Sequence, residues 1–479
     1  MEIVGISNPV PVSADVDRPH RRAAFLVVAA AVFVSNLDLF IVNVALPAMQ
    51  QHFHGSSLAT LSWVLNGYAI VFAALLVAAG RLADRIGHRR VFLAGLAVFT
   101  VASALCALAP AVGWLDAARV VQAAGAAALM PTSLALLLDA TPPTERPAAI
   151  RAWASIGGIA AGLGPVLGGL LVEADWRWVF IANVPVGAAA IAVGARVLPR
   201  LRGKEDGPLP DLFGAGLLTG AIAVLAVALV KGDDWGWGSA RVLGGLLAAV
   251  LLTGWFLLRS ARHPAPIVEL PLLRVPSFAA ANTAALLFTV AFAGMLLTSV
   301  LWCQQVWGYS ALRTGLAIAP GPLLVPPVAL GSAALVRRLG PGRLAALGTL
   351  LFAAGIGWWA ATIEIRPGYA TELLPGMLLT GLGVGLTLPT LIGSAAAALP
   401  PTRFATGSAV TTMARQIGAV VGVALTVSLI GTPHGPQAAL DAFRRGWTAV
   451  IVAALLAAAA SLLLATTQRR AAAAPVSTR

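Results

Sequence analysis

The sequence predicts an all-α integral membrane protein with about fourteen transmembrane helices. Hydrophobic residues make up 59% of the 479-residue chain and charged residues 11%, which is too little charge to cover the surface of a soluble domain of this length. The apolar residues also occur in long runs, such as 23–46, 243–258 and 450–464. A helix needs roughly 20 such residues to cross about 30 Å of hydrocarbon. These runs exclude a transmembrane barrel, whose strands alternate apolar and polar residues.

Polar breaks divide the hydrophobic sequence into individual helices. The expected helices are 24–47, 58–79, 91–109, 114–138, 150–172, 178–198, 211–231, 240–258, 277–302, 313–334, 344–362, 373–397, 408–430 and 446–466. With the N-terminus in the cytoplasm, this division puts most of the 32 Lys and Arg residues in cytoplasmic loops, as the positive-inside rule requires. One missed helix would invert every later loop, so the charges support the count and predict that both termini are cytoplasmic.

The sequence lacks the motifs of an ATP-driven pump or of an enzyme. Its two lysines, Lys204 and Lys231, lie outside any GxxxxGK[ST] loop, and no loop is long enough to form a separate catalytic domain. No cluster of His and Cys has metal-ligand spacing. We therefore expect a protein that is not an enzyme, that uses no cofactor or metal, and that draws its energy from a gradient.

A repeated loop divides the chain into two halves. At a constant offset of 253 residues, the loop after the second helix and the loop after the tenth share five residues, Leu82/Leu335, Arg85/Arg338, Gly87/Gly340, Arg90/Arg343 and Gly95/Gly348. Short basic loops also look alike by chance, but both of these loops join helices that run in the same direction. Parallel repeats of this kind are typical of transporters.

The offset spans eight helices, so we expect two six-helix bundles with two extra helices inserted between them. The expected segments are a cytoplasmic tail at 1–23, an N-terminal bundle at 24–198, a linker with the two inserted helices at 199–276, a C-terminal bundle at 277–466 and a cytoplasmic tail at 467–479. The two loops differ at one position, because Asp84 of the first copy is replaced by Arg337 in the second.

Helix 1 contains a carboxylate inside the hydrocarbon. Asp38 follows Arg22 by 16 residues, which is about 24 Å along a helix. A carboxylate within a span costs at least ~2.5 kcal/mol and usually faces a cavity and carries function. Asp38 therefore predicts a site that can bind a proton. The alternative is a structural carboxylate that is permanently paired with a neighbouring charge.

Helix 4 contains a basic and a polar residue on one face, because Arg119 and Gln122 are three residues apart. A buried guanidinium keeps its charge and creates a fixed positive field against which a carboxylate can titrate. Asp116 precedes Arg119 by three residues and is a competing partner that would simply neutralise it.

Two further segments combine glycine with charge or proline. The glycines of loop 80–90 permit a tight turn, and Asp84 is expected near a helix start, where it can bond free N–H groups. In helix 5, Gly164 and Gly168 form a small-xxx-small face for a close helix approach, and Pro165 can kink the span. Topology determination and ordinary helix packing are the alternative roles of these two segments.

Together these segments resemble the major facilitator superfamily, specifically its fourteen-helix drug:proton antiporter group. LDLFIVNVALP at 37–47 is similar to the group's LDxTIVNVALP, with Phe40 in place of Thr, and RVVQAAGAA at 119–127 is similar to RxxQGxGAA. GRLADRIGHRR at 80–90 resembles GxLADRxGRR, and GPVLGG at 164–169 resembles GPxxGG. The segments 176–187 and 415–418 are similar to the group's WRWxFxxNxPxG and RQxG stretches.

The resemblance implies the major facilitator fold and a proton-coupled antiporter that exports small amphipathic molecules, such as drugs, antibiotics or toxic metabolites. It implies proton coupling by Asp38 and Arg119. It also implies a cytoplasmic gate and an antiporter motif, formed respectively by Gly80, Asp84, Arg85, Gly87, Arg89 and Arg90 and by Gly164, Pro165, Gly168 and Gly169.

A set of polar and aromatic side chains on the expected helices are candidates for lining a central substrate cavity, with helix packing as their alternative role: Asn43, Trp63, Asn66, Gln122, Arg415 and Gln416. The expected partners are the lipid bilayer, protons and a small-molecule substrate, without nucleic acid, and we expect a monomer in the cell membrane. An importer or uniporter on the same fold, or a non-transporting membrane scaffold or sensor, are the alternative functions.

Overall fold

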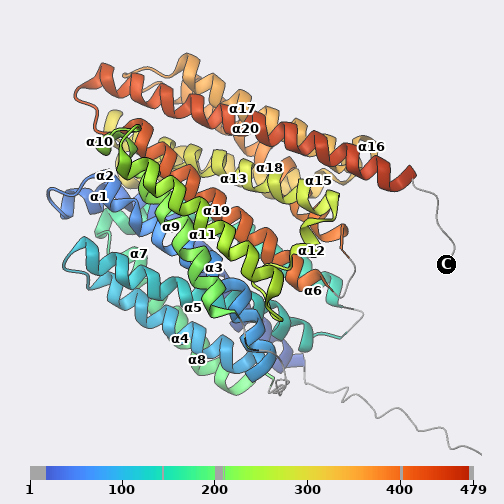
Figure 1. The fold of residues 1–479 in the computed structure, drawn as a ribbon. Coiled ribbons are helices and arrows are strands. Elements are labelled where there is room, and N and C mark those ends of the chain that lie inside the picture. Colours follow the sequence, from blue (N-terminus) through green and yellow to red (C-terminus); the bar gives the residue numbers. More distant parts are fainter. Residues whose placement is uncertain (1–17, 143–144, 200–208, 210, 400–402, 474–479) are drawn as a thin grey trace, which may run out of the picture.

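The helices of the computed structural model follow the expected spans closely (Figure 1). The structure describes residues 18–142, 145–199, 209, 211–399 and 403–473. Within them, 14 helical segments are long and apolar enough to cross a membrane, which confirms the expected count. Residues 18–23 and 467–473, expected in the tails, belong instead to the first and last helices. The rest of both expected tails, and residues 200–208 and 210 of the linker, lie outside the described residues.

The N-terminal half forms six spans, two of which begin with a short separate turn. The elements are α1 (Arg18–His52), α2 (Leu58–Leu61), α3 (Trp63–Ile86), α4 (His88–Ala107), α5 (Val112–Asp139), α6 (Arg146–Ala174), α7 (Trp178–Ile181) and α8 (Asn183–Val197). Ser57 starts α2 as its N-cap, because its hydroxyl accepts from the backbone N–H of Thr60 at 3.1 Å. Helix α1 packs against α6 and α8, while α5 packs against α3 and α4.

Two inserted spans follow and lie over the seam between the halves. They are α9 (Leu212–Val230) and α11 (Ala240–Arg262). A short helix follows each of them, α10 (Gly232–Trp235) after α9 and α12 (Leu270–Leu273) after α11. Helix α9 contacts both α3 and α19. Asp211 fixes this hairpin, because its carboxylate accepts from the Gly214 N–H at 2.8 Å and from Arg259 Nε on α11 at 2.7 Å.

The C-terminal half contributes the other six spans. Its elements are α13 (Pro276–Leu301), the π-turn η1 (Trp302–Val306), α14 (Ala311–Ile318), α15 (Pro320–Gly331), α16 (Ala333–Leu339), α17 (Pro341–Thr362), the π-turn η2 (Tyr369–Leu373), α18 (Leu374–Ala397), α19 (Phe404–Ile430) and α20 (Pro436–Ala473). Helix α13 packs against α19 and α20, and α17 packs against α18 and α20. The halves meet where α6 contacts α14 and where α3 contacts α19.

The repeated loop has the same backbone in both halves, at the same offset. Helix α3 ends at Ile86 and α16 ends at Leu339, and each is followed by a glycine with positive φ, 102° at Gly87 and 80° at Gly340. The next helix starts one residue later in both cases. Only glycine adopts this conformation without strain, so these two residues break the helices. The structure thus confirms the internal repeat.

The same region corrects two expectations. Residues 80–86 are helical rather than a loop, because Arg, Leu and Ala favour helix and Gly87 is the first residue that breaks it. Gly80 therefore lies inside α3, where a Cβ would be 3.4 Å from the Pro131 side chain, instead of forming a turn. Asp84 lies in the last turn of α3 and not near a helix start.

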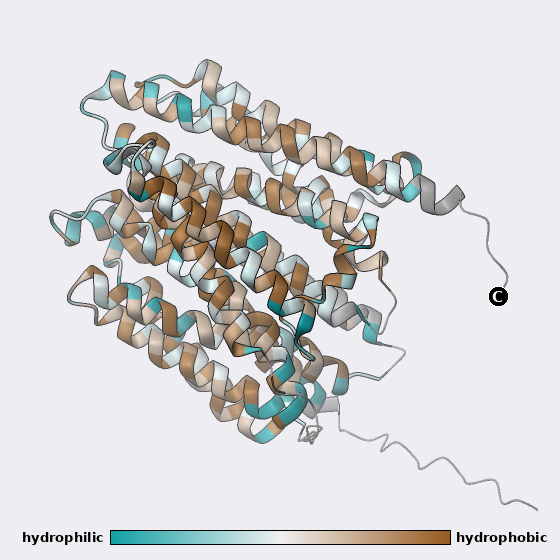
Figure 2. Ribbon diagram, viewed as in Figure 1, coloured by the Kyte–Doolittle hydropathy of each residue, from teal (hydrophilic) through white to brown (hydrophobic). Residues whose placement is uncertain are grey.

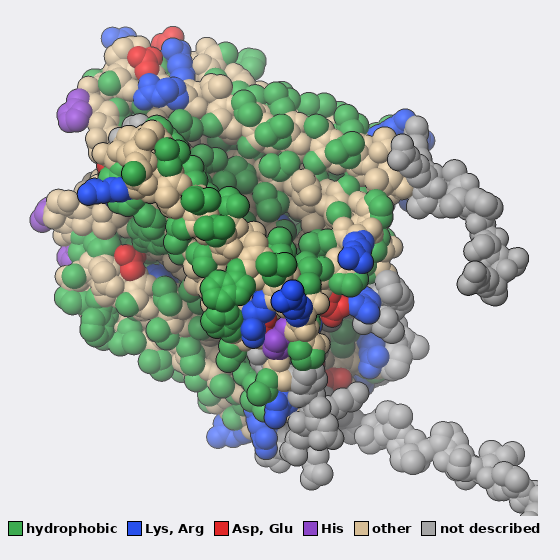
Figure 3. Space-filling model, in the orientation of Figure 1, with side chains coloured by type: hydrophobic (Ala, Val, Ile, Leu, Met, Phe, Trp, Pro, Cys, Tyr) green, Lys and Arg blue, Asp and Glu red, His purple; other side chains and the backbone are tan. Residues whose placement is uncertain are grey.

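The surface has the polarity that a membrane-spanning protein needs. Hydrophobic residues run along the flanks of the helices, and hydrophilic residues gather towards their ends (Figure 2). Figure 3 shows the same distribution of side chains, with Lys and Arg concentrated near the ends of the bundle. On α11, Leu247, Val250 and Leu251 are 59–67% exposed, which is favourable only against lipid.

Candidate functional site

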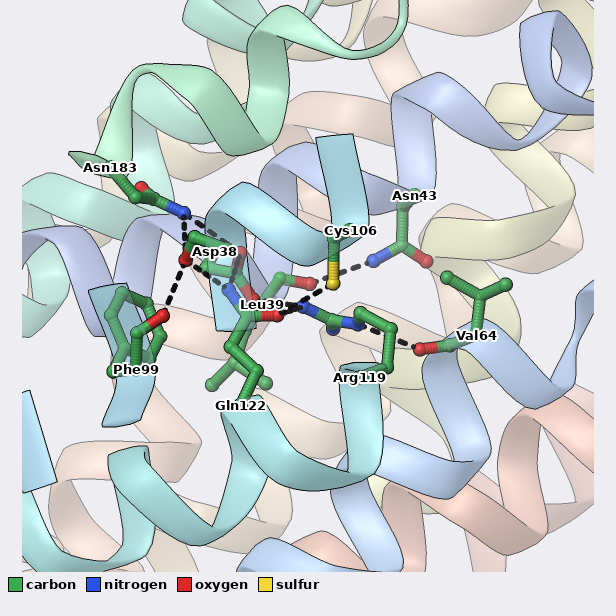
Figure 4. Close-up of polar contacts among 10 residues, drawn as sticks. Asp38, Leu39, Asn43, Val64, Phe99, Cys106, Arg119, Gln122 and Asn183 are labelled. Carbon is green, nitrogen blue, oxygen red and sulfur yellow. Dashed lines mark hydrogen bonds and ion pairs between the residues drawn. The ribbon is translucent and has the colours of Figure 1, made fainter. Parts of the chain in front are cut away.

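Asp38 is fully buried on α1 and is surrounded by hydrogen-bond donors from two other helices (Figure 4). Arg119 of α5 donates from Nη1 to Asp38 Oδ2 and forms an ion pair with it. Gln122, also on α5, donates from Nε2 to Asp38 Oδ1 at 3.0 Å. Asn183 at the start of α8 donates from Nδ2 to the same oxygen at 3.1 Å. The carboxylate is therefore bonded in its charged form by three side chains.

Arg119 has further partners besides Asp38. Its Nε donates to the backbone carbonyl of Val64 on α3 at 3.0 Å, and its Nη1 also donates to Gln122 Oε1 at 2.6 Å. The guanidinium carbon lies 4.1 Å from the centre of the Tyr68 ring, which stabilises the cation. The charge of Arg119 therefore keeps favourable contacts even when the carboxylate beside it is neutral.

Two residues of α4 hold the amides in place. Ser103 Oγ accepts from Gln122 Nε2 at 2.8 Å and from Asn183 Nδ2 at 3.5 Å, and donates to the Phe99 carbonyl at 2.8 Å. The Cys106 thiol donates to Gln122 Oε1 at 3.8 Å. Neither Ser103 nor Cys106 lies in one of the sequence motifs, so neither was expected at this site. Asn183 was visible in the resemblance but had no expected role.

The structure brings together the two residues that the sequence placed in separate motifs. Arg119 pairs with Asp38, whereas Asp116 forms no ion pair with Arg119 among the described residues, and its buried Oδ1 has no hydrogen-bond partner. The local neutralisation by Asp116 is therefore not what the structure shows. Both the proton-binding role of Asp38 and the alternative of a permanently paired carboxylate require this ion pair.

A buried ion pair of this kind is costly to break. Both charges are removed from water, and deleting one partner of a buried pair leaves the other uncompensated at a cost of ~3–5 kcal/mol. A proton added to Asp38 cancels one charge without removing any atom. Because Arg119 keeps Gln122, the Val64 carbonyl and the Tyr68 ring, the site has partners for both protonation states.

The glycines of the segment 164–169, expected to be an antiporter motif, lie where three helices meet. A Cβ on Gly164 would be 2.6 Å from Phe40 Cβ, and one on Gly168 would be 2.8 Å from the Ile41 side chain, so both face α1 just after Asp38. A Cβ on Gly169 would be 2.5 Å from the Ala311 carbonyl of α14. The motif therefore brings α6 close to α1 on one side and to the other half of the chain on another.

Pro165 and Gly315 form a second close approach between the halves. A Cβ on Gly315 of α14 would be 2.1 Å from the Pro165 carbonyl, so only glycine fits at this position. Gly162 faces α15 more loosely, since its Cβ would be 3.8 Å from the Pro322 carbonyl. The contact between α6 and α14 is consequently set by small residues on both sides.

The expected gate residues lie at the opposite end of α3 from Val64. Asp84 has a 71% exposed side chain, and its carboxylate contacts His88 Nε2 at 3.3 Å, within its own half of the chain. Arg89 donates from Nη2 to the Ala195 carbonyl of α8. Arg85 is half-buried and Arg90 is exposed, and neither takes part in an ion pair among the described residues.

An ionic contact between the halves is made by a residue that the sequence analysis missed. Glu269, in the segment that follows α11, accepts from Arg81 of α3 at 3.4 Å and from Arg403 at the start of α19. Nearby, Ile267 and Val268 pack into one hydrophobic cluster with residues of α3 and α19. No sequence pattern marks Glu269, because its two partners are 188 and 134 residues away.

The remaining cavity candidates lie on α1, α3 and α19. Asn43 is 7% exposed and donates to the Leu39 carbonyl of its own helix at 3.0 Å. Asn66 is 1% exposed, and neither of its side-chain polar atoms has a partner. Arg415 and Gln416 are half-buried, and Arg415 Nε is buried without a partner. Trp63 packs against the cluster between α3 and α19. Gln122 is the one candidate that belongs to the Asp38 site.

Comparison with solved structures agrees with this fold. A bacterial homolog of the human lysosomal transporter Spinster superposes with a TM-score of 0.69 and 16% identity, over 96% of this chain and 100% of that one. A proton dependent oligopeptide transporter superposes with a TM-score of 0.64 and 15% identity, over 93% and 99% of the two chains.

Curated relatives are closer in sequence. A tetracenomycin C resistance and export protein of Streptomyces glaucescens is 38% identical over 77% of this chain and 68% of its own length. A puromycin resistance protein of Streptomyces alboniger is 34% identical over 90% and 88% of the two chains. The profile of the Major Facilitator Superfamily matches residues 28–211 and 212–423. The chain is thus a multi-span membrane transporter that belongs to the Major Facilitator Superfamily.

Proposed function

We propose that this transporter is a proton-coupled antiporter that exports small amphipathic molecules across the cell membrane, with both termini in the cytoplasm. The observation that carries the proposal is the buried Asp38–Arg119 pair, in which a carboxylate that can bind a proton lies beside a cation that keeps its charge. Proton uptake at Asp38 changes the net charge of the site by one unit. A site whose charge changes during the cycle is what coupling to a proton gradient requires.

The coupling step proceeds through Arg119. When Asp38 is deprotonated, the guanidinium is held by the carboxylate, and α1 and α5 are joined by the ion pair. When Asp38 is protonated, the pair is lost, and Arg119 keeps its bonds to Gln122 and to the Val64 carbonyl on α3. The two protonation states therefore favour different positions of α1 relative to α3 and α5. The proton and the substrate bind alternately, each to one of these two arrangements.

The contacts at the far end of α3 form the cytoplasmic gate in this proposal. Arg81 is bonded to Glu269, which is also bonded to Arg403 of the other half. Breaking these ion pairs separates the ends of α3 and α19, and re-forming them joins the ends again. Asp84, Arg85 and the glycines at 80 and 87 position this end of α3.

The curated relatives support the choice of cargo. Their names refer to resistance to and export of tetracenomycin C and to resistance to puromycin. We assign antibiotics and related metabolites to this chain as its substrate class. The buried Asn66 and the half-buried Arg415 and Gln416 are candidate contacts for them.

The test uses purified protein in sealed proteoliposomes loaded on one side with a fluorescent antibiotic. An imposed pH gradient should drive movement of the antibiotic, and a protonophore should stop it. Asp38→Asn should abolish the uphill movement. Movement that needs ATP and ignores the pH gradient would contradict the proposal, as would full pH-driven transport by well-folded Asp38→Asn protein.

A further inference from the structure

A groove of about 830 Å³ opens on the flank of the C-terminal half, where α13, α19 and α20 lie side by side (Figure 1). Its walls are apolar and include Val290, Leu425 and Leu456 from the three helices. On α20, Ala449 and Ala453 line it with small side chains, which leave room between the helices. The volume lies within the range of sites that hold one small ligand.

One end of the groove carries charge, and the rest carries none. Arg444 and Arg445 line it where α20 begins, together with Asp441, and all three side chains are exposed. Residues 446–468 of α20 contain no charged residue, so the hydrocarbon region starts at the arginines. From Arg444 to Leu456 the helix rises about 18 Å, which is close to half of a ~30 Å hydrocarbon core. The groove therefore has the depth of one leaflet.

The charges at this end are available to a ligand. None of the three takes part in an ion pair among the described residues, and two cations against one carboxylate leave a net positive charge. Arginine binds phosphate through paired hydrogen bonds. We propose that this groove binds one anionic phospholipid, with its phosphate against Arg444 and Arg445 and an acyl chain along α20.

The N-terminal half of the chain contains a second groove that can be compared with this one. This second groove, of about 590 Å³, lies between α1, α6 and α8 at the repeat-related position. Val34 and Leu37 of this groove correspond to Leu287 and Val290 of the first at the offset of 253 residues. Its lining contains no charged residue. It can hold an apolar chain, but its lining offers no cation to a phosphate, so we expect head-group selectivity from the C-terminal groove.

The test is native mass spectrometry of detergent-purified protein titrated with dioleoyl phosphatidylglycerol and, separately, with dioleoyl phosphatidylcholine. We expect one phosphatidylglycerol to be retained in preference to phosphatidylcholine. Arg444→Gln with Arg445→Gln should weaken phosphatidylglycerol binding by roughly thirtyfold, the factor that corresponds to about 1 kcal/mol for each basic residue. Asp441→Asn should strengthen it, because it removes the opposing charge.

Two controls separate this site from a general effect of charge. Lys231→Gln with Arg241→Gln removes two cations near the ends of the inserted helices and should leave binding unchanged. Ala453→Phe fills the groove and should release the lipid while both arginines remain, and inorganic phosphate alone should not compete. Wild-type protein without head-group preference would overturn the proposal, as would unchanged binding in the double arginine variant that elutes as folded protein.

Discussion

The two halves of this transporter share their helix arrangement and differ in what occupies their centres. In the N-terminal half, α1 carries Asp38 inside a network of Ser103, Arg119, Gln122 and Asn183. At the same repeat position, α13 carries Ala291, which is fully buried and belongs to a hydrophobic cluster. In that half, Phe288 and Phe352 pack edge to face with ring centres 5.1 Å apart.

What the halves keep in common is backbone geometry. Gly95 of α4 and Gly125 of α5 cross so closely that a Cβ on Gly95 would be 2.9 Å from the Gly125 carbonyl. In the second half, Gly348 of α17 crosses α18, where its Cβ would be 2.9 Å from the Gly383 carbonyl. The two copies of the repeat therefore share their close helix crossings, whereas the buried network around Asp38 is found in the N-terminal copy. In our proposal the N-terminal half binds the proton and the C-terminal half moves against it.

The largest expected effect comes from removing the carboxylate of Asp38. Asp38→Asn should abolish pH-driven transport, because the site loses its titratable group. It should also lower thermal stability, since Arg119 stays buried without a counterion, at a cost of up to ~3–5 kcal/mol. Transport in proteoliposomes and thermal unfolding in detergent measure the two effects separately.

A matched control for this variant removes both charges. Asp38→Asn with Arg119→Gln leaves no uncompensated ion and should recover much of the lost stability without recovering transport. If the double variant were as unstable as Asp38→Asn alone, the loss would not come from an unpaired Arg119. Recovery of pH-driven transport in the double variant would remove the pair from the mechanism.

The converse experiment puts the carboxylate into the other half. Ala291→Asp places an acid at the repeat-related position, inside a cluster of buried hydrophobic residues. We expect reduced stability and expression, because a buried ionised group without a partner is strongly unfavourable. Ala291→Val adds volume without charge and serves as the control. Full expression and unaltered unfolding of Ala291→Asp would show that the C-terminal centre is more polar than its lining indicates.

A smaller effect is expected where the halves touch. Gly315→Ala would bring a Cβ to 2.1 Å from the Pro165 carbonyl, so α14 and α6 must separate. Transport should fall severalfold or more while each half stays folded. Gly357→Ala in α17 has nothing within 4 Å and is the control. Equal transport by the two variants would mean that this contact is not needed in the cycle.

The smallest expected effect is at the ion pairs of Glu269 with Arg81 and Arg403. Glu269→Gln removes two partly exposed ion pairs, each worth about 0.2–1 kcal/mol, so the transport rate should change by a factor between roughly two and thirty. Asp234→Asn, which breaks the local pair with Lys231, should leave transport rates unchanged. High salt should reduce the difference between wild type and Glu269→Gln, because salt screens exposed charges.

The sequence predicted the features that recur along the chain and the residues that are unusual inside a membrane. The fourteen spans follow from the lengths of apolar runs, and Asp38 stood out because a carboxylate in hydrocarbon is costly. The pairing of Asp38 with Arg119 is a contact over 81 residues, and the sequence named both partners but not the bond. Ser103 and Glu269 could not be predicted, because a serine in a membrane helix and an acid in a linker are ordinary until their distant partners are known.

The position of α3 has a thermodynamic consequence. A carbonyl in its first turn accepts the hydrogen bond from Arg119, and its last turns contain Arg81, which forms an ion pair with Glu269. These two points are 17 residues, or about 26 Å, apart on one rigid helix. If proton binding at one end of α3 alters the stability of the Arg81–Glu269 ion pair at the other end, reciprocity requires that this ion pair alter the proton affinity by the same factor. A mutation at the membrane surface would then shift the pH at which transport is half-maximal, without touching the proton site.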